Sequence, residues 1–429
     1  MLRSRMRMRG GSGGAWYQQG KADGVDPSLW ADFVNNRYAV NGVEAPFADV
    51  FTYTRASTAT YFDASGVLQT ASANTPRFDY DPITLQPKGI LIEEQRTNLL
   101  LRSSEFDNGT WLQEGVTVLP NTSLAPDGSL SADAISVNTV STFRKVIQNF
   151  SATSGTYTFS TYIKAGSTSS AVLYVAGFSI ASASVISGPG SAGATGSSGG
   201  CAFSGLSSSQ WSRISVTFTA TGAGTTQYNI YPGNSNSQLS GDSIYVWGAQ
   251  LEVGAFPTSY IPTTTAAVTR SGDSILNSSA NAVPFASWYN QTEGCFNPEF
   301  TYIGQSAGAY PQMMFAIDNT QNNRIGILVD DSGTPKVSFQ SYVSNAYQGI
   351  GTGALDPTGI LLKAAGAYKN NDGAISFNGL GAVSDATFGI PTVDRLNINI
   401  STSSACFYMR QARYYPIRVT NSELARITT

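Results

Sequence analysis

Histidine is absent from all 429 residues of the sequence. It is the side chain that most often serves as a general base and as a metal ligand. Its absence excludes a Ser-His-Asp triad or a Cys-His nucleophile. The sequence also has no Cys-x-x-Cys pair, so we expect no structural zinc site and no cofactor. Whether calcium binds stays open, since no Asp-rich loop points to it.

Charged residues are scarce, at 12% of the chain against roughly 25% in an ordinary globular protein. The net charge of −3 gives no indication of nucleic-acid or anionic-membrane binding. A run of about 20 apolar residues is also lacking, so no membrane span is expected. The three cysteines, Cys201, Cys295 and Cys406, are odd in number and far apart. They do not fit a disulfide framework, and we expect them to be small buried side chains.

Glycine, tyrosine and phenylalanine are plentiful, with 43, 21 and 21 residues. This composition is typical of short strands joined by turns and predicts an all-β fold. Runs with period-two alternation are expected as strands at residues 156–164, 171–175, 211–219, 227–231, 243–248, 294–303, 312–318, 323–329, 336–341, 360–368, 374–378, 395–400 and 406–415. They predict two antiparallel, jelly-roll-like β-sandwiches, at 96–265 and 271–429. A small β-rich anchoring region is expected at 26–95, and a short helix at 420–427.

The first 25 residues are expected to form a basic arm. Arginines occupy every second position, at Arg3, Arg5, Arg7 and Arg9. In an extended chain this spacing puts all four on one face, where they could dock in an acidic groove or beside another protein's sheet. A disordered basic tail is the alternative. Since no apolar segment follows the arginines, we expect no signal peptide, and assembly in a cytoplasm.

Two long blocks of sequence resemble one family. The first comprises FTYTRASTATYFDASG (51–66), PRFDYDP (76–82) and GILIEEQRTNLLLRSSEFDNGTW (89–111), and the second is YVWGAQLEVGAFPTSYIPTTTAAVTR (245–270). They resemble structural proteins of bacteriophages and prophages, described as tail fibre, head fibre or minor structural proteins. The second block is similar to the end of a carbohydrate-binding β-sandwich. The C-terminal ARYYPIRVTNSELARIT (412–428) more weakly resembles the end of a concanavalin-like or laminin-G-like jelly roll.

The resemblance implies a non-enzymatic virion protein. We expect a fibre or spike subunit, docked through its arm to tail, baseplate or capsid proteins and displaying glycan-binding sandwiches for host attachment. It also implies a homotrimer. A capsid head fibre or decoration protein is the first alternative. A glycan-degrading spike is the second, but the sequence lacks the Glu-x-Asp-x-Glu alternation of jelly-roll glucanases.

Candidate functional side chains are of two kinds. Glu93, Glu94 and Arg96 lie close together in an apolar context and are expected to form ion pairs at a domain junction. A catalytic carboxylate pair is the alternative there, although adjacent strand residues point to opposite faces. Aromatic residues that could stack on a sugar are Trp111, Tyr228, Tyr231, Tyr302 and Tyr368, with Trp111 expected to be the most exposed. Trp211 and Trp247 are expected in the core.

Overall fold

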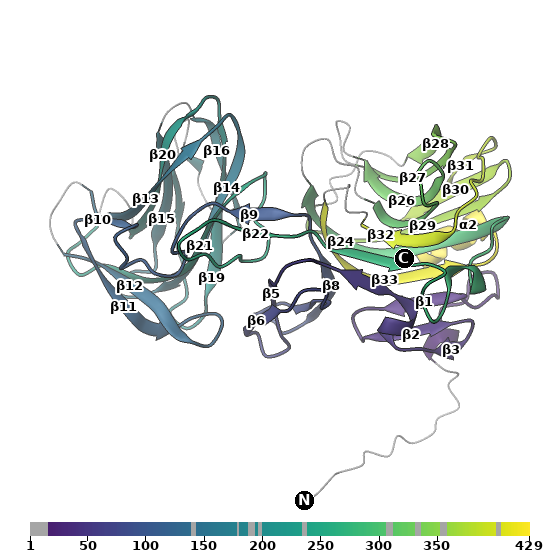
Figure 1. The fold of residues 1–429 in the computed structure, drawn as a ribbon, viewed down its shortest axis with the longest axis horizontal. Helices are drawn as coiled ribbons and strands as arrows, with labels where there is room; N and C mark the ends of the chain where they lie inside the picture. The colour runs from purple at the N-terminus through teal and green to yellow at the C-terminus, as the bar shows by residue number, and fades with distance from the viewer. Residues whose placement is uncertain are drawn as a thin grey trace, which may run out of the picture.

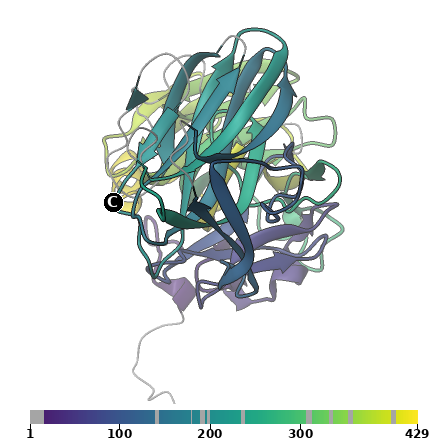
Figure 2. The same cartoon turned by 90° about the vertical axis from the view of Figure 1, so that its left-hand side faces the viewer.

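The computed structural model describes residues 16–138, 143–177, 180–187, 194–195, 200–233, 238–305, 312–330, 336–351, 358–399 and 405–429. Within these ranges the chain is almost entirely β-strand and forms two antiparallel β-sandwiches, which confirms the predicted fold class. Figure 1 shows the sandwiches side by side, and Figure 2 shows the first in front of the second. The arm with Arg3, Arg5, Arg7 and Arg9 lies outside the described residues.

The first sandwich is built from residues that follow one another in the chain. One sheet has the order β10 (Leu112–Glu114), β13 (Lys145–Ala152), β20 (Gly224–Pro232), β15 (Ala171–Gly177), β18 (Gly200–Phe203), β17 (Ala194–Thr195). The facing sheet has the order β11 (Val116–Leu124), β12 (Leu130–Val137), β21 (Ser243–Val253), β14 (Gly155–Ala165), β19 (Ser212–Ala220), β16 (Ile180–Ser187). Alternate residues such as Ile214, Val216 and Phe218 of β19 pack into the core between the sheets.

The second sandwich combines both ends of the chain. Its larger sheet has the order β3 (Val43–Glu44), β2 (Arg37–Val40), β1 (Leu29–Asp32), β33 (Ala405–Tyr415), β24 (Glu293–Gln305), β29 (Leu361–Lys369), β30 (Asp372–Phe377), β31 (Val383–Asp385), with β7 (Phe78–Tyr80) on β8 (Pro87–Ile92) and β8 on β33. The facing sheet has the order β28 (Ala346–Gly351), β27 (Lys336–Val343), β26 (Arg324–Asp330), β25 (Gln312–Ile317), β32 (Arg395–Ile398), β23 (Ser274–Asn277), β4 (Thr52–Thr54).

The N-terminal strands therefore belong to the second sandwich, which differs from the expected separate anchoring region at 26–95. Leu29 of β1 pairs with Tyr414 of β33, and Ile275 of β23 pairs with Tyr53 of β4. Short strands cannot bury an apolar face on their own, and here they complete the core of a distant segment. The first sandwich is thus an insertion in the second.

The chain leaves and re-enters the second sandwich through one paired ribbon. β9 (Arg96–Asn98) leads into the first sandwich and β22 (Val268–Arg270) leads back, and the two strands pair antiparallel. Figure 1 shows this ribbon between the sandwiches, with the hairpin of β5 (Ala59–Phe62) and β6 (Leu68–Ala71) below it. The hairpin packs on the first sandwich, where Leu68 joins a cluster with Tyr162 and Tyr260.

Helices are few and short in the part of the chain that the structure describes. They are η1 (Trp16–Gln18), α1 (Phe47–Val50), η2 (Phe285–Ser287) and α2 (Asn421–Ile427). None of these helices has the length and apolar character needed to cross a membrane. The predicted C-terminal helix is present as α2, but its first turn does not form a capping box. Thr420 and Glu423 instead bond Asp23, which ties the helix to the N-terminal segment.

The cysteine prediction is confirmed. Cys201, Cys295 and Cys406 are all buried and free. Burial raises the pKa of the Cys201 thiol to about 11, so it stays protonated near neutral pH.

The shared core predicts how fragments of the chain behave. Residues 271–429 alone should fail to fold, because the core then lacks the apolar side chains of β1, β4 and β8. A chain in which a short Gly-Ser linker replaces residues 100–266, with the β9–β22 ribbon kept, should fold cooperatively. Circular dichroism and thermal unfolding of both proteins check this. A cooperative transition in the 271–429 fragment would contradict the shared core.

Candidate functional site

A cleft of about 960 Å³ lies where the two sandwiches and the β5–β6 hairpin meet. This volume is within the range of small-molecule and oligosaccharide sites. One wall comes from the hairpin and the β7–β8 turn, with Phe62, Val67 and Ile83. The opposite wall comes from the first sandwich and includes Lys164 and Trp211.

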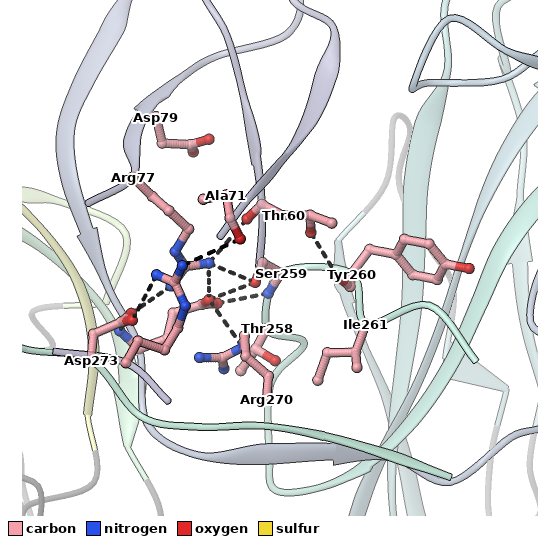
Figure 3. Close-up of polar contacts among 12 residues, drawn as sticks. Thr60, Ala71, Arg77, Asp79, Thr258, Ser259, Tyr260, Ile261, Arg270 and Asp273 are labelled. Carbon is pink, nitrogen blue, oxygen red and sulfur yellow. Dashed lines mark hydrogen bonds and ion pairs between the residues drawn. The ribbon is translucent and has the colours of Figure 1, made fainter. Parts of the chain in front are cut away.

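The floor of the cleft adjoins a buried ion cluster (Figure 3). Arg77 is at its centre, and its side chain is fully buried. The guanidinium donates to Glu93 Oε2 at 2.7 Å and to Asp273 Oδ2 at 2.5 Å. It also donates to the backbone oxygen of Thr60 at 3.0 Å and to Ser259 Oγ at 2.9 Å. One side chain thus joins the hairpin, the first sandwich and the start of β23.

Two further arginines surround this cluster. Arg55 lies 3.3 Å from Asp273 Oδ1 and donates to backbone oxygens of the hairpin segment, among them that of Ser72 at 2.6 Å. Arg270 lies 3.5 Å from Glu93 and donates to the backbone oxygen of Glu94 at 2.7 Å. The buried carboxylates are therefore shared among several cations, which is the arrangement that buried ions require.

The two central groups are held charged. Burial alone would raise the pKa of Glu93, but Arg270, Arg77 and the hydrogen bonds from Ser259 outweigh it and lower the pKa to about 2. Burial alone would lower the pKa of Arg77, but Asp273 and Glu93 raise it well above its usual value. Protonating Glu93 would therefore weaken its contacts with Arg77 and Arg270.

The pKa of Asp79, on the cleft wall, is shifted in the opposite direction from that of Glu93. Burial raises its pKa above the usual range, although Lys88 at 3.8 Å acts in the other direction. Its two oxygens accept hydrogen bonds from the Phe62 amide at 2.6 Å and the Tyr408 hydroxyl at 2.9 Å. Both of its oxygens are thus engaged by the protein itself.

A half-buried aromatic and a lysine form the opposite wall. Lys164 Nζ lies 5.1 Å from the ring centroid of Trp211 and 5.1 Å from that of Tyr245. The ammonium donates to Ser123 Oγ at 2.6 Å, and the Trp211 indole donates to the backbone oxygen of Leu124 at 3.0 Å. The tryptophan is therefore held in position with its ring at the cleft surface.

The aromatic residues that the sequence suggested for sugar stacking are placed elsewhere. Trp111, Tyr228, Tyr231, Tyr302 and Tyr368 are all buried, with exposures of 1%, 0%, 6%, 3% and 0%. The expectation that Trp111 is exposed is wrong: its ring packs on Phe106 and its indole donates to the backbone oxygen of Arg102. None of the five lines the cleft.

Glu93, Glu94 and Arg96 all form ion pairs where the two sandwiches meet, but the two glutamates pair with different arginines. Arg96 pairs with Glu94 and lies over the ring of Phe256, while Glu93 pairs with Arg77 and Arg270. The two glutamates thus face different cations, in the short connection between β8 and β9.

The sequence analysis did not identify Trp211 or Lys164 as cleft residues, although the alternation of apolar residues after Trp211 indicates which face of the strand that side chain lies on. In β19 the core residues are Ile214, Val216 and Phe218, so the opposite phase of the strand points away from the core. Trp211 and Arg213 have that phase, and both line the cleft. Trp247, expected in the core, is buried.

No protein-family model and no curated protein sequence matches this chain. Among solved structures, the CBM40 of Ruminococcus gnavus IT-sialidase bound to α2,3-sialyllactose is 12% identical over 33% of this chain and 84% of that one, with a TM-score of 0.28. Domain 4 of AbnA, an arabinanase from Geobacillus stearothermophilus, is 12% identical over 40% and 81%, with a TM-score of 0.30. Trypanosoma rangeli sialidase is 11% identical over 36% and 26%, with a TM-score of 0.29. At these TM-scores the likenesses carry no argument about function.

The ion cluster predicts how stability depends on pH. The pKa of Glu93 is about 2 in the folded chain against 4.5 ordinarily, so its contribution is complete above pH 4.5 and is lost as the pH falls toward 2. That loss is about 3 kcal/mol. Glu93→Gln should be less stable at pH 5 and should lose less on acidification. Urea unfolding between pH 5 and pH 2 measures both slopes.

The matched control is Glu105→Gln, which alters a surface carboxylate whose ion-pair partner, Arg102, is itself partly exposed. It should leave the pH dependence as in the natural chain. Equal slopes for the natural chain and Glu93→Gln would show that Glu93 does not keep its charge through the cluster.

Proposed function

We propose that this chain is a structural subunit of a bacteriophage particle, a fibre or spike that binds a glycan of the host surface in the cleft between its sandwiches. The proposal that the chain binds a glycan rests on Trp211, whose ring is held by a hydrogen bond and lines a cleft of oligosaccharide size. Aromatic rings stack on the apolar faces of sugars, and neighbouring polar groups bond the hydroxyls.

The virion part rests on the sequence resemblance, which the junction supports in one respect. Arg55, Arg77 and Glu93 come from the first resembling block, and Ser259 and Arg270 come from the second. These two stretches, more than 130 positions apart, meet in one buried cluster. A chain with this two-sandwich architecture therefore needs both blocks, because each block supplies part of the buried cluster.

The proposal describes a binding protein, not an enzyme. Glycoside hydrolysis needs two carboxyl groups placed across the sugar. The two carboxylates that line the cleft, Asp79 and Glu93, both have their oxygens engaged by protein donors. Assembly as a homotrimer and docking through the arm belong to the same proposal, as does the alternative of a capsid head fibre.

The glycan proposal is tested on a glycan array with the full chain. Trp211→Ala should weaken binding about tenfold, because it removes the stacking ring. Thermal unfolding establishes that the variant is folded, since Trp211 also packs on the cluster of Tyr162 and Tyr260. The control is Tyr347→Ala, which removes an aromatic side chain that is 56% exposed on the second sandwich. Binding that depends on Tyr347 and not on Trp211 would move the site out of the cleft.

The virion proposal is tested by deleting residues 1–10. Both sandwiches should keep their thermal unfolding transition, since the described core begins after this segment, while incorporation into particles should be lost. Immunoblots of purified particles check this. Normal incorporation would reject docking through the arm. In a particle reconstruction, contact of the arm with tail proteins would indicate an adsorption fibre, and contact with capsid proteins a head fibre.

A further inference from the structure

The ammonium group of Lys164 is the least compensated charge in the cleft wall. It lies between the rings of Trp211 and Tyr245 and is half-buried. Ser123 Oγ is its one hydrogen-bond acceptor among the residues that the structure describes. An ammonium has three protons to donate, so two remain for another acceptor.

Lys21, Lys88 and Lys145 each have a carboxylate partner. Lys88, also in the cleft, lies 3.8 Å from Asp79, and Lys145 lies 3.8 Å from Glu114. In the described part of the chain, no carboxylate lies within ion-pair distance of Lys164. Burial lowers the pKa of its ammonium, and no opposing charge offsets this effect. Removing a cation from water without a counter-ion is unfavourable. Binding of an anion beside Lys164 should therefore lower the free energy.

The carboxylates that line the cleft do not oppose such an anion. Glu93 is neutralised by Arg77 and Arg270 behind the cleft floor. Asp79 is paired with Lys88, and burial raises its pKa. Arg213 adds a further positive charge beside Trp211, held by hydrogen bonds to Ser160 and to the backbone oxygen of Thr258.

We propose that the glycan bound in the cleft is acidic, with its carboxylate, phosphate or sulfate group on Lys164 and a neighbouring sugar ring on Trp211. This inference rests on the proposed glycan-binding function and names the chemical class of the ligand. The rings beside Lys164 also exclude water from the ion pair, which strengthens it. A neutral glycan of the same size would leave the ammonium unpaired.

The test uses the full chain on an array that holds carboxylated, phosphorylated and sulfated glycans beside neutral ones, including methyl-esterified forms of the carboxylated glycans. Acidic glycans should bind, and their esters should bind about tenfold more weakly. Raising the ionic strength should weaken acidic binding alone. The class of acid that binds best identifies the group on Lys164.

Two variants assign the effect to this side chain. Lys164→Met keeps the stem over the rings and removes the charge, and it should reduce acidic binding to the level of the esters. Lys164→Arg should retain a preference for acidic glycans. Lys21→Met is the control, because Lys21 is exposed and paired with Asp26 away from the cleft. Thermal unfolding establishes that each variant is folded.

The outcomes separate this inference from the function on which it rests. Equal binding of acidic glycans and their esters, or undiminished acidic binding by folded Lys164→Met, would overturn the acidic ligand and leave glycan binding intact. Absence of binding to every glycan on the array would overturn both.

Discussion

The side chain of Arg77 has to find partners for a charge that no water reaches. Its partners are a carboxylate that follows β8, a carboxylate that precedes β23, and a hydroxyl from the end of the first sandwich. A buried ion is tolerated when nearby opposite charges and hydrogen bonds compensate it, and removing one partner leaves the others with an uncompensated charge. The relative position of the hairpin and the sandwiches therefore depends on ion pairs as well as on apolar contact. The cleft depends on that position, since its walls belong to different segments of the chain.

Many strands of both sandwiches were predictable because their apolar residues alternate, and alternation is a local property. In β19, for example, alternation indicates the core positions Ile214, Val216 and Phe218, although Ser215 and Thr217 of the opposite phase are also buried. Strands β11, β12 and β13 of the first sandwich were not predicted. The pairing of β1 with β33 was not predictable, because Leu29 and Tyr414 are almost 400 positions apart and no local pattern names a partner. For the same reason, the sequence did not indicate that the first sandwich is inserted in the second.

The candidate site shows the same division between local and distant information. Alternation indicates which residues share a strand face, but it does not tell which faces are covered by other segments. Tyr368 was a reasonable surface candidate on its strand, yet its hydroxyl lies 2.7 Å from that of Tyr414 in the core. Trp211 was assigned to the core, yet the hairpin that packs nearby leaves it half-exposed in the cleft. Glu93, Glu94 and Arg96 were identified as junction residues from their spacing, while Arg77 and Asp273 required the structure.

The paired ribbon of β9 and β22 has a mechanical consequence. Tension that pulls the first sandwich away from the second is divided between two covalent strands, both extended along the same line. The hydrogen bonds between the strands are then not sheared, because both strands stretch together. Rotation of one sandwich about the other would instead twist the ribbon and separate the ions beside it. The two-stranded connection is therefore suited to transmitting tension between the sandwiches while it resists their rotation about each other.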